Sequence, residues 1–71
     1  MYNGELLGDN IQRRGLKKKH IAAALGLSPY GFAKKVSGQN EFLASEIRAL
    51  TDELHLTASE RDRIFFAKEV N

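Results

Sequence analysis

The feature that most constrains this chain is a short stretch near its middle, Gly26-Leu27-Ser28-Pro29. Glycine readily adopts the left-handed conformation that ends a helix. Serine accepts a hydrogen bond from the first N–H groups of a helix, and proline fits the first helical position, where its missing N–H is not needed. The stretch therefore predicts that one helix ends and another begins within four residues.

Glycines and the spacing of apolar residues divide the rest of the chain in the same way. Apolar residues recur at intervals of three and four, which places them on one face of a helix. Thr57-Ala58-Ser59-Glu60 matches the capping-box pattern that starts a helix. The predicted helices span residues 5–14, 17–25, 29–36 and 44–54, with a last short helix from 58 to 65. The fold class is therefore predicted to be all-α, a compact bundle of about five short helices.

A chain of 71 residues is long enough for one domain. We expect residues 1–71 to form that single domain, with residues 68–71 frayed. The apolar faces of the predicted helices supply one core. Its expected members are Leu7, Ile11, Leu16, Ile21, Leu25, Leu27, Phe32, Val36, Phe42, Ile47, Leu50, Leu54, Leu56, Ile64 and Phe65.

Composition argues against several classes of protein. A domain this small cannot spare apolar contacts for a deep substrate cavity. The chain has no cysteine, and its two histidines, His20 and His55, are 35 residues apart, so no metal site is recognisable. No serine has a histidine and an acid at a spacing that suggests a catalytic triad. The sequence predicts neither an enzyme nor a cofactor, metal or small-molecule site.

Segments that target a protein to a membrane are not expected either. The longest uncharged stretch, residues 21–33, is 13 residues long and broken by glycine and proline, too short to span a bilayer. Residues 1–10 carry two acids and no base, unlike a signal peptide. We expect a cytosolic protein without membrane contact.

Charge is strongly segregated along the chain. The net charge is +2, but residues 10–40 contain no acid and seven basic residues, and the remainder carries four basic residues and nine acids. The seven are Arg13, Arg14, Lys17, Lys18, Lys19, Lys34 and Lys35. A block of one sign builds a positive potential over part of the surface. The pattern favours a polyanionic partner, although the run of three lysines alone is also typical of a solvated helix start.

Residues 17–38 combine a helix, a sharp turn and a second helix, the anatomy of a helix-turn-helix. The pattern Ile21-Ala22-x-x-Leu25-Gly26-Leu27-Ser28, followed by Phe32-x-x-x-Val36-x-Gly38, resembles the Cro and phage-repressor (lambda repressor-like) helix-turn-helix family. Residues 32–38, with Phe42, Glu46-Ile47 and Ile64-Phe65-Phe66, resemble small regulators of Gram-positive phages within it. The resemblance covers residues 6–66 and implies a regulator that binds operator DNA in a phage or mobile-element genetic switch. It also implies a location in the bacterial cytosol, associated with the nucleoid.

The resemblance also implies a role for each exposed residue of the motif. In the family the third helix enters the major groove, and the second helix crosses the phosphate backbone. Contact with base edges is therefore expected from Pro29, Tyr30, Gly31 and Lys34. Contact with phosphates is expected from Lys17, Lys18, Lys19, Ser28, Lys35, Ser37, Gln39 and Asn40, in the last three through backbone N–H groups and side chains.

Two departures from the family pattern affect this interpretation. Many members begin the second helix with threonine and place glutamate three residues on, but this chain has Lys17 and His20. Lysine near a helix N-terminus opposes the helix dipole, which is unfavourable unless a phosphate lies there. Residues 29–35 also lack the arginine, asparagine and glutamine that read bases with paired hydrogen bonds. We therefore expect mostly electrostatic affinity and modest sequence specificity.

Adjacent aromatic residues near the C-terminus indicate a contact with another protein. Phe65 and Phe66 are adjacent, so one helix cannot bury both in a small core. We expect a partner surface at Leu43, Phe66 and Ala67. The family resemblance implies a homodimer on DNA, and the same surface suits a heteromer with a repressor protein. The alternative function is therefore an anti-repressor or modulator that acts mainly by binding a partner repressor.

Overall fold

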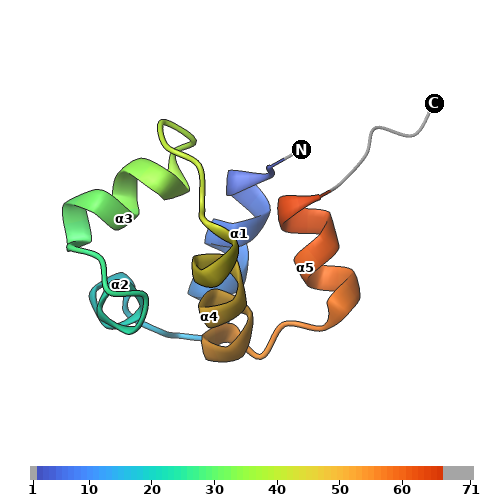
Figure 1. The fold of residues 1–71 in the computed structure, drawn as a ribbon. Coiled ribbons are helices and arrows are strands. Elements are labelled where there is room, and N and C mark those ends of the chain that lie inside the picture. The colour runs from blue at the N-terminus through green and yellow to red at the C-terminus, as the bar shows by residue number, and fades with distance from the viewer. Residues whose placement is uncertain (1, 67–71) are drawn as a thin grey trace.

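The computed structural model describes residues 2–66 and contains five helices and no strand in that range (Figure 1). They are α1 (Gly4–Arg13), α2 (Lys18–Ala24), α3 (Pro29–Val36), α4 (Ala44–Leu54) and α5 (Ala58–Phe65). The predicted all-α class and number of helices are confirmed, and the ends differ from the predicted ones by a residue or so, as helix termini commonly do. Residues 68–71, expected to fray, lie outside the described range.

The turn between α2 and α3 forms as its sequence predicts. Gly26 has a φ of +74° and ends α2, and the N–H of Leu27 returns to the carbonyl of Ala22 at 2.9 Å. Ser28 is the N-cap of α3, its hydroxyl accepting the N–H of Gly31 at 3.0 Å, and Pro29 occupies the first turn. Four residues thus reverse the chain with most of the exposed helix-end groups satisfied.

One core joins all five helices. Its buried apolar members are Leu7, Ile11, Ile21, Ala22, Phe32, Leu50, Leu54, Leu56, Ile64 and Phe65. The predicted core residues Leu16, Leu25, Leu27, Val36, Phe42 and Ile47 are only partly buried and pack against it. None of the helices within residues 2–66 has the length and hydrophobicity needed to cross a bilayer.

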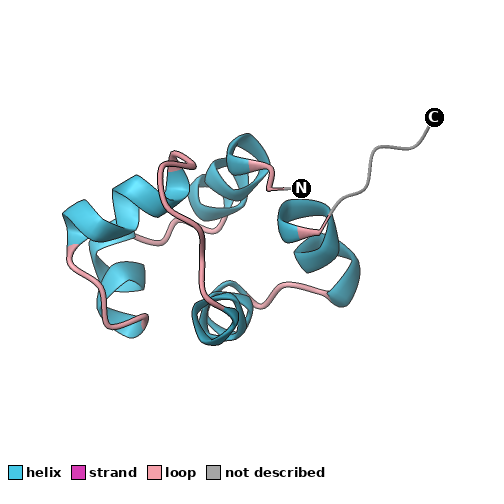
Figure 2. Cartoon of the chain, turned by 45° about the horizontal axis from the view of Figure 1, so that its top comes forward, coloured by secondary structure: helices cyan, strands magenta, loops and turns pink. Residues whose placement is uncertain are grey.

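The helices are arranged so that α2 and α3 form one end of the molecule and α5 the other. Both ribbon views place α1 and α4 between these two ends (Figures 1 and 2). The described basic block of α2 and α3 is therefore separated from α5 by the body of the fold. Any partner of α3 approaches a surface that α5 does not cover.

Tyr2 ties the start of the chain to the end of α3. Its hydroxyl donates a hydrogen bond of 2.8 Å to the carbonyl of Val36, and its ring lies 5.8 Å from that of Phe42 and 5.9 Å from that of Phe65. Burial raises the pKa of the Tyr2 hydroxyl to about 12, so it remains a donor at neutral pH. This hydrogen bond satisfies a carbonyl at the C-terminus of α3 that would otherwise need another donor.

Candidate nucleic-acid interface

The third helix has one buried face and one open face. Phe32 is 1% exposed and packs in the core. On the opposite side, Pro29, Tyr30, Ala33 and Ser37 are exposed, and Tyr30 is 73% exposed, the most of any large apolar side chain described. An α-helix turns by about 100° per residue, so these four positions fall on one stripe along the helix. The structure thus leaves a complete helical face open to a partner.

Tyr30 and Lys34 lie one turn apart on this face and contact each other. The ammonium of Lys34 lies 5.2 Å from the centre of the Tyr30 ring, within the range of a cation–π interaction. The ring therefore holds the half-buried Lys34 side chain along the helix surface. Two of the four predicted base-contacting residues are brought together in this way, with Pro29 exposed at the start of the same helix.

Gly31 also has a role within α3 that the sequence did not indicate. It is only partly exposed, and a Cβ atom added there would lie 3.2 Å from the Ser28 hydroxyl oxygen. That oxygen accepts the Gly31 N–H, so glycine leaves room for the cap of α3. The residue missed by the sequence analysis is Ala33, whose small exposed side chain leaves the open face accessible. Ala33 directly follows the buried Phe32, and this position in the sequence could have indicated that Ala33 is exposed.

Lys35 does not face outward as the sequence analysis expected. Its ammonium contacts the carboxylate of Glu46 in α4, and the two side chains are 14% and 9% exposed. The same carboxylate accepts the N–H of Leu43 at 2.8 Å. Burial raises the pKa of Glu46, but these hydrogen bonds and the charge of Lys35 outweigh it and hold the pKa below its ordinary value. The charge of Lys35 is thus neutralised within the protein, and Lys35 is removed from the phosphate-binding set.

The loop after α3 also differs from the prediction. The N–H groups of Ser37, Gly38, Gln39 and Asn40 all donate to carbonyls of α3, those of Gln39 and Asn40 both to Lys34. The Ser37 hydroxyl donates to the Lys34 carbonyl at 3.0 Å. These donors close the end of the helix and are not directed at a ligand. Of the phosphate contacts predicted for Ser37, Gln39 and Asn40, only those from the side-chain amides of Gln39 and Asn40 remain possible.

The lysines at the start of α2 remain exposed. Lys17 is the N-cap of α2 but makes no side-chain capping bond, and the first turn contains no acid. Within residues 2–66, none of Lys17, Lys18, Lys19 and Lys34 forms an ion pair. Lys18 lines a hollow of about 430 Å³ beside α1 that is also lined by Asp9. The positive charge of this segment is therefore uncompensated by ion pairs, with Asp9 as an acid nearby.

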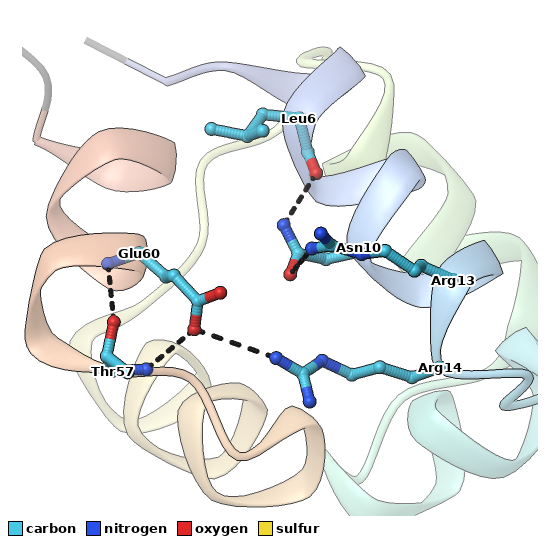
Figure 3. A network of polar contacts seen from close by, with 6 residues as sticks. All are labelled: Leu6, Asn10, Arg13, Arg14, Thr57 and Glu60. Atoms are coloured by element: carbon cyan, nitrogen blue, oxygen red, sulfur yellow. Dashed lines mark hydrogen bonds and ion pairs between the residues drawn. The ribbon is translucent and has the colours of Figure 1, made fainter.

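Arg13 and Arg14, at the end of α1, make contacts within the fold. Figure 3 shows Arg14 directed at Glu60 of α5, with a nitrogen–oxygen distance of 3.6 Å. Arg13 donates to the side chain of Asn10 at 2.8 Å, and Asn10, only 2% exposed, donates to the carbonyl of Leu6 (Figure 3). The seven basic residues of the acid-free block thus do not form one surface. Arg14 and Lys35 are paired with acids. Among residues 2–66, Lys17, Lys18, Lys19 and Lys34 form no ion pair and remain available to a polyanion.

Two exposed apolar side chains mark a second surface. Leu43 is 59% exposed and Phe66 is 52% exposed, whereas Phe65 is 8% exposed. The expectation that the core holds only one of the two adjacent phenylalanines is confirmed. Phe66 and Ile47 line two neighbouring hollows of about 380 and 330 Å³. Ala67, the third predicted residue of this surface, lies outside the described range.

Other kinds of site find little support among residues 2–66. No group of three or more histidine, cysteine, aspartate or glutamate side chains is placed to hold a metal ion there. His20 lies 3.7 Å from Glu53 on the surface, and His55 is an exposed residue at the end of α4. The open face of α3 and the unpaired lysines are therefore the candidate site of the described chain.

Comparison of the chain with protein-family models, with curated proteins and with solved structures finds no match.

Proposed function

We propose that this protein is a small transcriptional regulator that binds double-stranded operator DNA, with α2 and α3 acting as a helix-turn-helix. Its setting would be a genetic switch of a phage or mobile element, as the sequence resemblance implies. The observation that carries the proposal is the open face of α3, on which Tyr30 and Lys34 lie together. This activity needs no cofactor and no catalytic residue.

The dimensions of α3 suit the major groove. An α-helix with its side chains is about 10–12 Å across, close to the roughly 12 Å width of the groove, and the eight residues of α3 give about two turns to lie in it. In the proposed complex Lys34 donates to the acceptors of a guanine, and Tyr30 donates its hydroxyl to a base edge or phosphate. Pro29 contacts a thymine methyl group, and Ala33 lets the helix lie close to the bases.

Phosphate contacts would come from both ends of the motif. Lys17, Lys18 and Lys19 at the start of α2 supply charge, and the Gln39 and Asn40 side chains supply neutral donors. Because these contacts carry no sequence information, we expect strong salt dependence and limited discrimination between sites. An exposed lysine near the start of a helix is locally unfavourable, a cost that a bound phosphate would offset.

The test measures the affinity of single variants for a short duplex selected from a random library, by fluorescence anisotropy at several salt concentrations. Lys18→Ala should weaken binding to all duplexes alike and reduce the salt slope by about 0.9. Lys34→Ala should cost about 1 kcal/mol on the selected duplex and less on others. Arg63→Ala is the matched control, since it removes one exposed positive charge on α5.

The control variant should bind like the parent protein. Equal weakening by all three substitutions would mean that net charge alone attracts DNA. Unchanged affinity after both lysine substitutions would contradict the proposal.

A second candidate function is binding to a partner protein, as an anti-repressor or modulator or within a homodimer on DNA. The exposure of Leu43 and Phe66 favours it, since large exposed apolar side chains are typical of protein contacts. Phe66→Asp should abolish the effect on a partner repressor and leave cooperative unfolding intact. A specific footprint on one operator by the isolated protein, unchanged in Phe66→Asp, would contradict this candidate.

A further inference from the structure

The larger hollow beside Phe66 has the composition of a small binding site. Its volume is about 380 Å³, at the low end of the range for small-molecule pockets and large enough for one side chain. Four aromatic rings and two polar side chains line it: Tyr2, Phe42, Phe65, Phe66, Asn40 and Glu41. The hollow therefore combines a mostly aromatic wall with a polar rim.

The aromatic wall is held by contacts between the rings. Phe42 and Phe65 meet edge to face with centroids 5.5 Å apart, and Tyr2 lies within 6 Å of both. Phe66, 6.3 Å from Phe65, is the exposed member. Tyr2 is fixed at its far end by the hydrogen bond to Val36. Most of the wall is thus preformed, which lowers the entropy lost on binding.

Among residues 2–66, the charged side chain that lines this hollow is an acid. Glu41 is exposed, and no basic side chain of residues 2–66 lines the hollow with it. Arg48 and Arg61 line the neighbouring hollow, where Asp52 is also present. Aromatic faces carry a negative quadrupole, so the rings and the carboxylate favour the same sign of ligand. The hollow is complementary to a cation with an apolar stem.

We propose that this hollow binds an arginine side chain of a partner protein. A guanidinium group is planar, stacks on aromatic rings and donates to a carboxylate, and its three-carbon stem is apolar. The guanidinium would lie against the exposed Phe66 ring at the aromatic wall and donate to the Glu41 carboxylate, with the Asn40 amide at the rim. The proposal gives a chemical identity to the second candidate function, on which it rests, and it does not depend on DNA binding.

The experiment titrates the full chain with two probes, N-acetyl-arginine methylamide and its neutral isostere N-acetyl-citrulline methylamide. Amide chemical shifts are followed by NMR. We expect shifts at Asn40, Glu41 and Phe42, and binding of the arginine probe about five-fold tighter than that of the citrulline probe. Lys19 in α2 should not shift.

Three variants test whether the preference for the arginine probe arises in this hollow. Glu41→Gln should remove most of the difference between the probes, and Glu5→Gln, at an exposed acid in α1, should leave it unchanged. Phe66→Ala should weaken both probes, and because Phe66 is half exposed, the fold should survive.

Three results would overturn the proposal. They are equal affinity for the two probes, shifts confined to α2 and α3, and shifts at the same amides when the protein alone is concentrated. The last would mean that a second copy covers the hollow. Loss of DNA binding in the lysine variants has no bearing on these measurements, so the two proposals fail separately.

Discussion

Two helices of this molecule begin in opposite ways. At the start of α5, the Thr57 hydroxyl accepts the Glu60 N–H at 3.1 Å, and the Glu60 carboxylate accepts the Thr57 N–H at 2.9 Å. At the start of α2, Lys17 offers no acceptor, and lysines fill the positions after it. The first arrangement satisfies the helix end and the helix dipole, whereas the second satisfies neither.

The difference separates charged side chains that pair within the fold from those that remain available to a partner. Glu60 also lies 3.6 Å from Arg14, so the start of α5 joins α5 to the end of α1 (Figure 3). The lysines of α2 have no such partner among residues 2–66. A region that forgoes a local stabilising arrangement is a candidate functional region. The comparison therefore supports α2 and α3 as the end of the molecule that meets a ligand.

The sharpest contrast lies within α3, between adjacent lysines. Lys35→Ala should lower the free energy of unfolding by about 3 kcal/mol, because it leaves the nearly buried Glu46 carboxylate without its cation. Urea unfolding followed by circular dichroism measures this loss. Lys34→Ala, one residue earlier, should change stability by less than about 0.5 kcal/mol, since it removes a surface contact with Tyr30. Similar stability losses in the two variants would contradict the division of roles between them.

The sequence was sufficient for the parts of the fold that depend on local chemistry. The turn at Gly26, the cap at Ser28 and the capping box at Thr57 each involve residues within four positions of one another. Apolar spacing likewise predicted the buried Phe32, and the family resemblance implied the exposure of Tyr30, one turn from Lys34. Such features are predictable because the hydrogen bonds and packing that define them are set within one or two helical turns.

What the sequence could not give were pairings between distant residues. Lys35 and Glu46 are 11 positions apart, and Arg14 and Glu60 belong to different ends of the chain. All of these residues are charged and are also common on solvent-exposed surfaces. The spacing of residues along the sequence therefore does not distinguish a buried ion pair from an exposed charge. The electrostatic surface of α3 was therefore overestimated, although its geometry was predicted correctly.

A smaller change in stability is expected when the N-cap residue of α2 is replaced by one that can accept a hydrogen bond, as Thr57 does in α5. Lys17→Ser supplies an acceptor at the N-cap and removes a charge that opposes the helix dipole. It should raise the free energy of unfolding by about 0.5–1 kcal/mol while weakening DNA binding, because a proposed phosphate contact is lost. Chemical denaturation and anisotropy on the same sample measure both changes.

The matched variant at the other helix is Thr57→Ala. It removes one half of a formed capping box and should lower stability by about 1 kcal/mol without changing DNA affinity. If Lys17→Ser were to stabilise the protein and bind DNA as tightly as the parent, the lysine at this N-cap would have no part in recognition.

The smallest expected effect is the dependence of stability on pH. Burial raises the pKa of Glu46, but the hydrogen bonds from Lys35 and Leu43 more than offset it, so the folded-state pKa lies below the ordinary value of 4.5. A carboxyl group with a lowered folded-state pKa contributes stability that is complete above its ordinary pKa and is lost as pH falls toward the folded value. The contribution of Glu46 should therefore be constant above about pH 5.5 and decline below it.

Glu46→Gln separates this contribution from that of the other acids. The variant keeps the size of the side chain but has no charge to pair with Lys35, so it should be less stable than the parent at pH 7. On acidification the parent carboxyl becomes neutral as well, and the difference in unfolding free energy between the two proteins should shrink. A difference that stays constant from pH 7 to pH 3 would mean that the charge of Glu46 is not what stabilises its contact with α3. In that case Lys35 would be free to contribute to the positive surface after all, and the contrast between the two lysines of α3 would no longer hold.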